Sequence, residues 1–302
     1  MPSSRRRCGW TTRVRSTTTS DNLGHLTVLS TQFTLATASF CRIVRDYHVH
    51  SNYSDGRFLF QMVRAADEAG LDGVGFADHC TVTEREDRRG ERAEYAFNLD
   101  LTYERRRRGI ERLREEFDLA VYDAVEMDYE PRDEGAIDSF LDEANFDYAI
   151  GSVHELDGSN VQVPSNFADR SAATLDALVD EYFDRLVSLV ESELFDIAAH
   201  PDLIERTGPL RGRATEDQYD RVARAFAESR TVPEINAGRA LTDLDLVHPS
   251  EGFLAAFREY DVDVTLGTDS HYPDEIGSRA AFLTDFVADR DLEPVEPAGL
   301  GR

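Results

Sequence analysis

Short apolar runs alternate with amphipathic stretches along this 302-residue chain from about residue 44 onward. Seven runs, rich in β-branched and apolar residues, have the length of buried strands. They span residues 43–49, 73–77, 120–127, 148–153, 196–199, 232–235 and 262–266. Between them, apolar residues recur at helical spacing, most clearly over 59–66 and 175–190. Thr215 followed by Gln218 adds the capping-box pattern of a helix start. This alternation is typical of a parallel α/β sheet or barrel.

Charge separates the first 45 residues from the rest. Residues 1–45 contain seven Arg, fifteen Ser or Thr and a single acidic residue, Asp21, so they carry a charge of +6. Because the whole chain carries −26, residues 46–302 carry −32. Arg5, Arg6 and Arg7 ahead of an apolar stretch are reminiscent of a targeting peptide, but Ser, Thr and Gln interrupt that stretch. We therefore expect a disordered or mis-annotated extension over 1–45 and a functional domain over 46–302.

The remaining composition limits the class of protein. Acidic residues number 59 against 33 basic ones, and every basic residue is Arg. Such surfaces are typical of proteins from salt-rich, halophilic cytoplasm, where salt screens the repulsion of polyanions, so the acidity only weakly disfavours a nucleic-acid substrate. Three cysteines without paired spacing indicate a reducing, cytoplasmic setting. The sequence contains no run of about eighteen apolar residues, so we expect no membrane association.

Potential metal ligands lie at the ends of the predicted strands. His48 and His50 close the first run, and residues i and i+2 of a strand point the same way. Asp55 follows in a Ser-Asp-Gly turn that can bring its carboxylate back over the strand end. Beyond the last run, Asp269 and His271 repeat the i, i+2 spacing. Taken alone, each pair would be as often structural as functional.

The second to fifth runs end in His79, Glu126, His154 and His200. Six of the eight histidines therefore lie where α/β barrels place their sites, whereas core histidines would scatter. The predicted ligands are His48, His50, Asp55, His79, Glu126, His154, His200, Asp269 and His271. A tetrahedral zinc takes four ligands, so nine indicate two or three ions, with a carboxylate such as Glu126 or Asp269 between them. Mixed imidazole and carboxylate donors favour zinc, manganese or iron.

Adjacent ions of this kind generate a bridging hydroxide and clamp a phosphoryl oxygen, which predicts a hydrolase acting on a phosphate ester. Metal-bound imidazoles usually donate their second N–H to a carboxylate or carbonyl. Asp78 and Asp128 are candidates for that supporting role, although either could instead be an exposed acid of an acidic protein.

The segments that carry these residues resemble the PHP family, named for polymerase and histidinol phosphatase. They are 46–56 (DYHVHSNYSDG), 77–79 (ADH), Glu126, 151–154 (GSVH), 199–202 (AHPD) and 267–271 (GTDSH). The resemblance implies a distorted seven-stranded (β/α) barrel of PHP type with a trinuclear metal site at the C-terminal ends of its strands. It covers nearly everything except the extension.

Within that family, 151–154 and the Glu-Ile-Asn at 234–236 look most like the histidinol-phosphatase branch, which implies L-histidinol phosphate as the substrate. The resemblance also implies that Arg239 helps to hold the phosphate, with Asp269, His271 and Glu126 in catalytic roles. Residues 239–249 do not match the branch pattern closely, and Arg239 has the alternative of a surface residue paired with Asp243 or Asp245.

Two other functions are compatible with parts of this pattern. A PHP-type nuclease or nucleotide phosphoesterase would use the same metals but needs a groove for nucleic acid, and no interleaving of basic and aromatic residues of the kind that follows single strands is visible. A non-catalytic module with a decayed site is disfavoured because all nine ligand positions hold competent donors. We expect a small phosphate ester as the binding partner, whereas the sequence does not indicate an oligomeric state.

Overall fold

The computed structural model describes residues 45–86, 98–156 and 158–301. They belong to one compact unit, Phe40–Arg302. The predicted extension, except for Arg45, lies outside the described residues, so its nature and the boundary before residue 46 stay predictions. Within the described ranges, no helix is long and apolar enough to cross a membrane.

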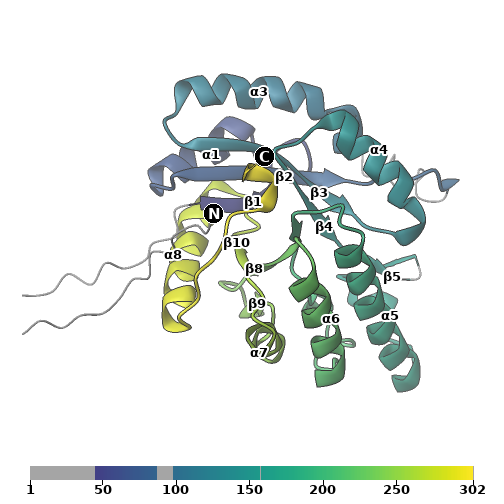
Figure 1. Ribbon diagram of the computed structural model, residues 1–302. Helices are drawn as coiled ribbons and strands as arrows, with labels where there is room; N and C mark the ends of the chain where they lie inside the picture. The colour runs from purple at the N-terminus through teal and green to yellow at the C-terminus, as the bar shows by residue number, and fades with distance from the viewer. Residues whose placement is uncertain (1–44, 87–97, 157, 302) are drawn as a thin grey trace, which may run out of the picture. The chain divides into compact units, whose positions relative to one another are not determined.

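A curled parallel sheet of seven strands forms the centre of this unit (Figure 1). Its order is β1-β2-β3-β4-β7-β8-β10, and all neighbours on this path are parallel. The strands are β1 (Arg45–Val49), β2 (Gly73–Cys80), β3 (Ala120–Asp128), β4 (Tyr148–Ser152), β7 (Ile197–Ala198), β8 (Val232–Arg239) and β10 (Thr265–Gly267). The prediction of a distorted seven-stranded α/β barrel is confirmed, with shifts only in the strand bounds.

Short strands extend this frame. β9 (Leu246–His248) pairs with β8 antiparallel, and β5 (Glu155–Leu156) pairs with β6 (Ser159–Asn160) in a separate hairpin. After β2, residues 81–85 form neither helix nor strand, and residues 87–97 lie outside the described part.

The helices between the strands bury the faces that the apolar spacing predicted. α5 buries Leu175, Leu178, Val179 and Tyr182 on one side, and Thr215 forms the predicted capping box with Gln218. The helices are α1 (Leu59–Glu68), α3 (Tyr103–Glu116), α4 (Glu134–Ala144), α5 (Ala172–Glu191), α6 (Glu216–Glu228), α7 (Glu251–Glu259) and α8 (Pro273–Asp289). α8 packs beside α1, and α6 packs beside both α5 and α7. The main core therefore lies between the sheet and these helices.

The inside of the curled sheet holds a smaller apolar cluster that includes Tyr47, Tyr148 and Ile150. The Tyr148 hydroxyl donates to the carbonyl of Tyr47 at 2.6 Å. Gly75 makes room for this hydroxyl, because a Cβ atom at residue 75 would lie 1.7 Å from the Tyr148 oxygen. Aromatic rings thus fill the N-terminal part of the interior and leave the C-terminal ends of the strands for polar side chains.

A bulge in β1 adjusts which side chains enter the interior. Between Asp46 and Val49, β1 contains one residue more than the facing segment of β2. As a result, Tyr47 joins the interior cluster and the next residue, His48, also reaches the interior acid Glu126. Strict alternation would have separated these two neighbours.

The first and last strands meet at their C-terminal ends and close the sheet there. Val49 and Ser270 form a parallel bridge. The Asp269 N–H donates to the His48 carbonyl at 2.8 Å, and the His50 N–H donates to the Ser270 carbonyl at 3.0 Å. Segments more than two hundred residues apart are thereby held together.

The side chain of Asp46 also holds together the seam, that is, the contact between the C-terminal ends of β1 and β10. It is fully buried and accepts hydrogen bonds from the backbone N–H and the hydroxyl of Thr268 and from the His48 N–H. Burial raises the pKa of this carboxyl to about 6, although these hydrogen bonds act in the opposite direction. The charge of Asp46 therefore depends on its donors.

Thr268→Val should destabilise the protein because it deprives a buried carboxylate of its hydroxyl donor. We expect a loss of about 1.5–3 kcal/mol in the free energy of unfolding, measured by urea denaturation at pH 8. Thr265→Val is the matched control: Thr265 lies three residues earlier, on β10, and is equally buried, but its hydroxyl donates to the neutral carbonyl of Val295. The control should cost only about 1 kcal/mol, and equal losses would contradict the special role of Asp46.

Candidate metal centre

Glu126 lies at the centre of a cluster of histidines at the C-terminal ends of the strands. Its side chain is 1% exposed. Glu126 Oε2 lies 2.8 Å from His79 Nδ1 and 3.4 Å from His48 Nε2. Glu126 Oε1 lies 3.0 Å from His200 Nε2 and 3.4 Å from His154 Nε2. Four imidazoles from four segments thus converge on one carboxylate.

The remaining four predicted donors extend this cluster toward the surface. His50 Nε2 lies 3.3 Å from Asp269 Oδ1 and 3.6 Å from Glu126 Oε2. His271 Nε2 lies 3.2 Å from Asp55 Oδ2, and the rings of His50 and His271 stack at 4.2 Å. The structure therefore brings all nine predicted donors into one continuous cluster.

The arrangement of these donors fits divalent metal ions. Three sets have ligand atoms within 4.8 Å of one another: His50 with Asp55, His79 and His271; His48 with His50 and Glu126; and His79 with Glu126 and His154. His48 Nε2 and His50 Nε2 face each other at 3.1 Å. Among the described residues, His200 Nδ1 is buried without a hydrogen-bond partner, and Glu126 Oε2 receives no hydrogen bond of good geometry even though His79 Nδ1 lies 2.8 Å away. Facing imidazole nitrogens beside an unsatisfied carboxylate oxygen suit a cation of the zinc, manganese or iron class.

Carboxylates outside the cluster orient two of its imidazoles. Glu234 Oε1 lies 2.8 Å from His48 Nδ1, and Asp128 Oδ1 lies 2.5 Å from His154 Nδ1. Each pairing places a proton on Nδ1 and leaves Nε2 directed at the centre. Glu234 Oε2 also accepts a hydrogen bond from the backbone N–H of His200 at 3.0 Å. The supporting role considered for Asp128 agrees with this geometry, whereas Glu234 was missed, although the Glu-Ile-Asn alternation on a buried strand was the available signal.

Asp78 does not support an imidazole in this way. It is fully buried and accepts from the N–H and hydroxyl of Ser51, from the Ser54 hydroxyl and from Arg106. Neither interpretation from the sequence, a carboxylate on an imidazole or an exposed acid, was correct for it.

Strand alternation explains only the first pair of histidines. β10 ends at Gly267, so Asp269 and His271 lie beyond the strand and converge through a turn in which Asp269 has φ 52°. His200 likewise lies beyond β7 with φ 29°. Left-handed backbone is costly for residues with a Cβ and concentrates at functional sites. Asp269 and His271 therefore converge as predicted, but through this turn and not through the i, i+2 alternation of a strand.

The family model of the PHP domain matches residues 46–238 of the chain. The chain belongs to the PHP domain family. This match covers β1 to β8 and thus seven of the nine predicted donors, and the seam with β10 supplies the other two.

Named relatives agree with this membership. The chain is 26% identical over 231 residues to a protein of Deinococcus radiodurans named probable histidinol-phosphatase. The matched region covers 76% of this chain and 86% of that protein. It is 27% identical over 237 residues to the histidinol-phosphatase of Lactococcus lactis, covering 75% of this chain and 83% of that protein. The fold matches the crystal structure of the histidinol phosphate phosphatase of Lactococcus lactis, complexed with zinc, L-histidinol and phosphate. That match has a TM-score of 0.67 and 23% identity, and covers 85% of this chain and 97% of that chain.

Arg206 is a cluster residue that sequence reasoning missed. Its side chain is 7% exposed, and its guanidinium lies 3.1 Å from Asp269 Oδ2. Arg206 Nε donates to His248 Nε2 at 2.9 Å, and His248 Nδ1 lies 2.7 Å from Asp202 Oδ1. His248 is fully buried on β9. Only tertiary contacts bring Arg206 here, so its sequence context gave no signal.

Arg239 lies at the end of β8, next to the cluster. The preceding residue, Gly238, is so close to Asp269 that a Cβ atom would lie 2.5 Å from the Asp269 Oδ2 atom. The Arg239 guanidinium donates to the Gly238 carbonyl, and not to Asp243 or Asp245 as in the surface alternative. Burial and the positive charge of Arg206 lower the pKa of Arg239. Two arginines therefore lie near the same carboxylate.

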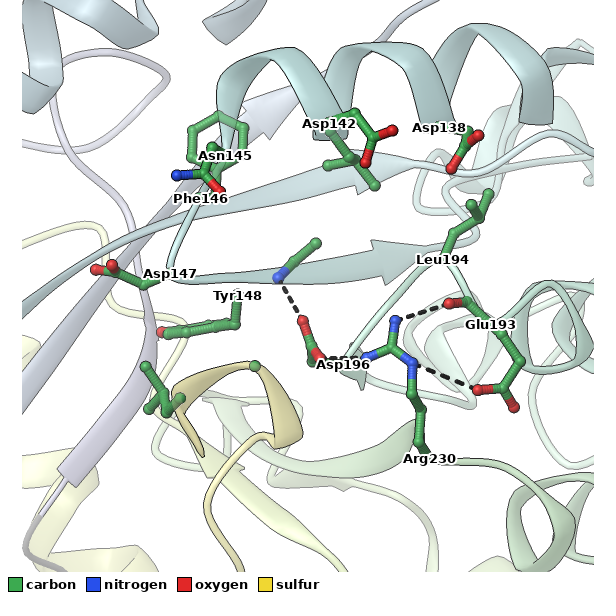
Figure 2. Close-up of a pocket in the computed structure, with 14 residues that line it drawn as sticks. Asp138, Asp142, Asn145, Phe146, Asp147, Tyr148, Glu193, Leu194, Asp196 and Arg230 are labelled. Atoms are coloured by element: carbon green, nitrogen blue, oxygen red, sulfur yellow. Dashed lines mark hydrogen bonds and ion pairs between the residues drawn. The ribbon is translucent and has the colours of Figure 1, made fainter. Parts of the chain in front are cut away.

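A cavity of about 520 Å³ lies at the opposite ends of the strands (Figure 2). Residues at the start of β4 and before β7 line it, and several of them are acidic. Arg230 pairs with Asp196 and with Glu193, and Asp196 also accepts the Ala149 N–H, as the dashed lines in Figure 2 show. The charges of Arg230, Asp196 and Glu193 are already paired with one another, so we place the functional site at the Glu126 cluster.

Ionic attraction shifts the titration of the cluster. Burial alone would lower the pKa of His79 and of His154, but the Glu126 carboxylate raises them to about 9 and about 10. Burial would raise the pKa of Glu126, yet the surrounding imidazoles hold it well below its usual value. At neutral pH the ligand-free protein therefore contains protonated His79 and His154 beside an ionised Glu126, whereas burial lowers the pKa of His200 to about 4 and leaves its imidazole neutral.

Zinc binding should release protons from this cluster at pH 7. A metal ligand must be deprotonated, whereas His79 and His154 still hold their protons below pH 9, so zinc affinity should rise with pH toward 9 and fall on acidification. Calorimetric titration of the ligand-free protein in two buffers of different ionisation enthalpy should report release of about one proton or more. Identical heats in the two buffers would contradict the prediction.

Proposed function

We propose that the chain is a metal-dependent phosphomonoesterase that hydrolyses L-histidinol phosphate to L-histidinol and phosphate. The observation that carries the proposal is the cluster of imidazoles and carboxylates around Glu126. The membership of the chain in the PHP family and its similarity to two relatives named histidinol-phosphatase support the proposed substrate, L-histidinol phosphate. We further propose two or three ions, with zinc favoured by the Lactococcus structure and manganese or iron as alternatives. A cytoplasmic location stays a prediction from the sequence.

The proposed ligands are the nine predicted donors: His48, His50, Asp55, His79, Glu126, His154, His200, Asp269 and His271. Divalent ions bound by such donors activate water and neutralise charge on phosphoryl oxygens. We assign catalytic roles to Glu126, Asp269 and His271, because Glu126 joins the buried imidazoles and Asp269 lies between His50 and His271.

The remaining residues position the donors and the substrate. Glu234 and Asp128 fix two imidazoles with Nε2 toward the centre. Arg206 and Arg239 add positive charge beside Asp269, where a phosphate dianion would be attracted. Asp55, His79 and His271 are the more exposed donors, with side chains 41%, 26% and 22% exposed, so substrate reaches the cluster from their side.

A panel of phosphate esters tests the proposed substrate. Full-length protein should be assayed at high salt with zinc or manganese against histidinol phosphate, sugar phosphates, nucleotides and short oligonucleotides. We expect the highest kcat/KM for histidinol phosphate, because the site offers two arginines for one terminal phosphate. A clear preference for oligonucleotides would instead support a PHP-type nuclease and reject the proposal.

Arg239→Ala should weaken binding of the phosphate group while leaving metal content intact. Loss of one hydrogen-bonding cation should raise KM for the phosphomonoester about tenfold or more. The matched control is Arg112→Ala on α3, where a guanidinium 65% exposed pairs with Glu115 and Glu116. Unchanged KM in Arg239→Ala, with the control also unchanged, would remove Arg239 from the phosphate site.

A further inference from the structure

A buried ion pair lies behind the metal centre, between the sheet and α3. Arg106 and Asp78 are both 0% exposed, and Arg106 Nη1 lies 2.8 Å from Asp78 Oδ2. Asp78 follows the core residue Phe76 by two positions on β2, so it points to the helix side while His79 points inward. Everywhere else this layer is built mainly from apolar side chains. Burying two charges there is costly and stabilises a fold less than apolar packing would, so the pair calls for another explanation.

The other contacts of Asp78 connect the pair to a single turn. Asp78 Oδ1 accepts the Ser51 N–H at 2.7 Å and the Ser54 hydroxyl at 2.8 Å. Asp78 Oδ2 accepts the Ser51 hydroxyl at 2.8 Å. Together with Arg106, four donors therefore saturate this carboxylate, and three of them belong to residues 51–57, which follow His50.

This turn carries Asp55, whose position depends on it. The N–H groups of Ser54 and Gly56 both donate to the Ser51 carbonyl, and the Arg57 N–H donates to the His271 carbonyl at 3.0 Å. Asp55 is the most exposed of the nine donors, with a side chain 41% exposed, so packing does little to fix it. Its carboxylate nevertheless lies 3.2–3.8 Å from nitrogens of three histidines.

Arg106 is itself held from behind. Its Nη2 donates to Asp123 Oδ1 at 2.7 Å, and Arg107 Nε donates to the other oxygen of Asp123 at 2.6 Å. One planar guanidinium thus spans two carboxylates, which the single ammonium of a lysine cannot do in this geometry. Arg107 shares Asp123 with Arg106, but its hydrogen bonds go to Asp123 and to two carbonyls at the C-terminal end of α4 and not to Asp78, so it provides a matched control.

We propose that Arg106 and Asp78 are positioning residues that fix the turn 51–57, so that Asp55 is already placed against His50, His79 and His271 before a metal binds. The pair acts from the opposite side of β2 and touches neither the substrate nor the cluster ligands. The consequence for metal binding rests on the proposed function, since it requires Asp55 to be a ligand. The consequence for the turn itself does not.

Hydrogen exchange of the ligand-free, full-length protein tests the turn directly. Arg106→Met removes the charge that holds Asp78, and Ser51→Ala removes one hydroxyl donor while leaving the ion pair in place. In both variants the amides of Ser54 and Gly56 should exchange faster than in the parent protein, by about tenfold for Arg106→Met. The amides of β3 should keep their protection, and Arg107→Met should match the parent at every one of these positions.

Zinc titration tests the consequence for the site. Changes in residues that orient metal ligands typically weaken affinity about 10–100-fold. Arg106→Met and Ser51→Ala should therefore weaken the lowest-affinity zinc by at least about tenfold and leave tighter zinc bound, whereas Arg107→Met should titrate like the parent.

Two results would overturn the proposal. One is parental exchange of the turn in both variants. The other is accelerated exchange of β3 to the same extent as the turn, in both variants, because the pair would then serve only general stability. If the parent protein bound no zinc at all, the proposed function would fail, while the exchange measurement would still decide the role of Arg106 and Asp78.

Discussion

The buried carboxylate of Glu126 is the group around which the rest of the molecule is arranged. An ionised carboxylate without compensation is very costly in a protein interior, and four imidazoles from four different segments supply that compensation here. Each imidazole comes from a different strand end. The parallel order of the sheet places these ends at one edge, and the aromatic side chains fill the N-terminal part of the interior, so that the polar side chains lie together around Glu126. The main role of the barrel is thus to bring the donors of the cluster together at the C-terminal ends of its strands.

Closure between the first and last strands completes the arrangement. The Val49–Ser270 bridge helps to fix Asp269 and His271 relative to His50, although more than two hundred residues separate them in the chain. The seam combines backbone hydrogen bonds with the buried carboxyl of Asp46, whose raised pKa shows that the local environment does not solvate its charge well. The contact that places Asp269 and His271 beside His50 therefore also carries the free-energy cost of a buried carboxyl group.

Much of this could be predicted from the sequence, because strand ends in a parallel sheet meet at one edge and histidines were concentrated there. His48 and His50 followed from alternation alone. The bulge at Tyr47 and the left-handed turns at His200 and Asp269 did not, since nothing in the local sequence signals an extra residue or a positive φ at a non-glycine position. Arg206 and Glu234 were missed for a different reason: their importance lies in partners that are distant along the chain.

The opposite orientation of His79 and Asp78 on β2 also bears on how the chain finds its register. Side chains alternate along a strand, so a slip of one residue exchanges the two faces. In the slipped arrangement the carboxylate would enter the barrel beside the acid Glu126, and the imidazole would lie under α3 against the guanidinium of Arg106. Two carboxylates would then meet inside the barrel, and on the other side the charge of Arg106 would face a neutral imidazole in place of its carboxylate, where little water is present to screen it. The alignment of β2 is therefore specified by charge as well as by apolar patterning, and a misaligned strand is penalised twice.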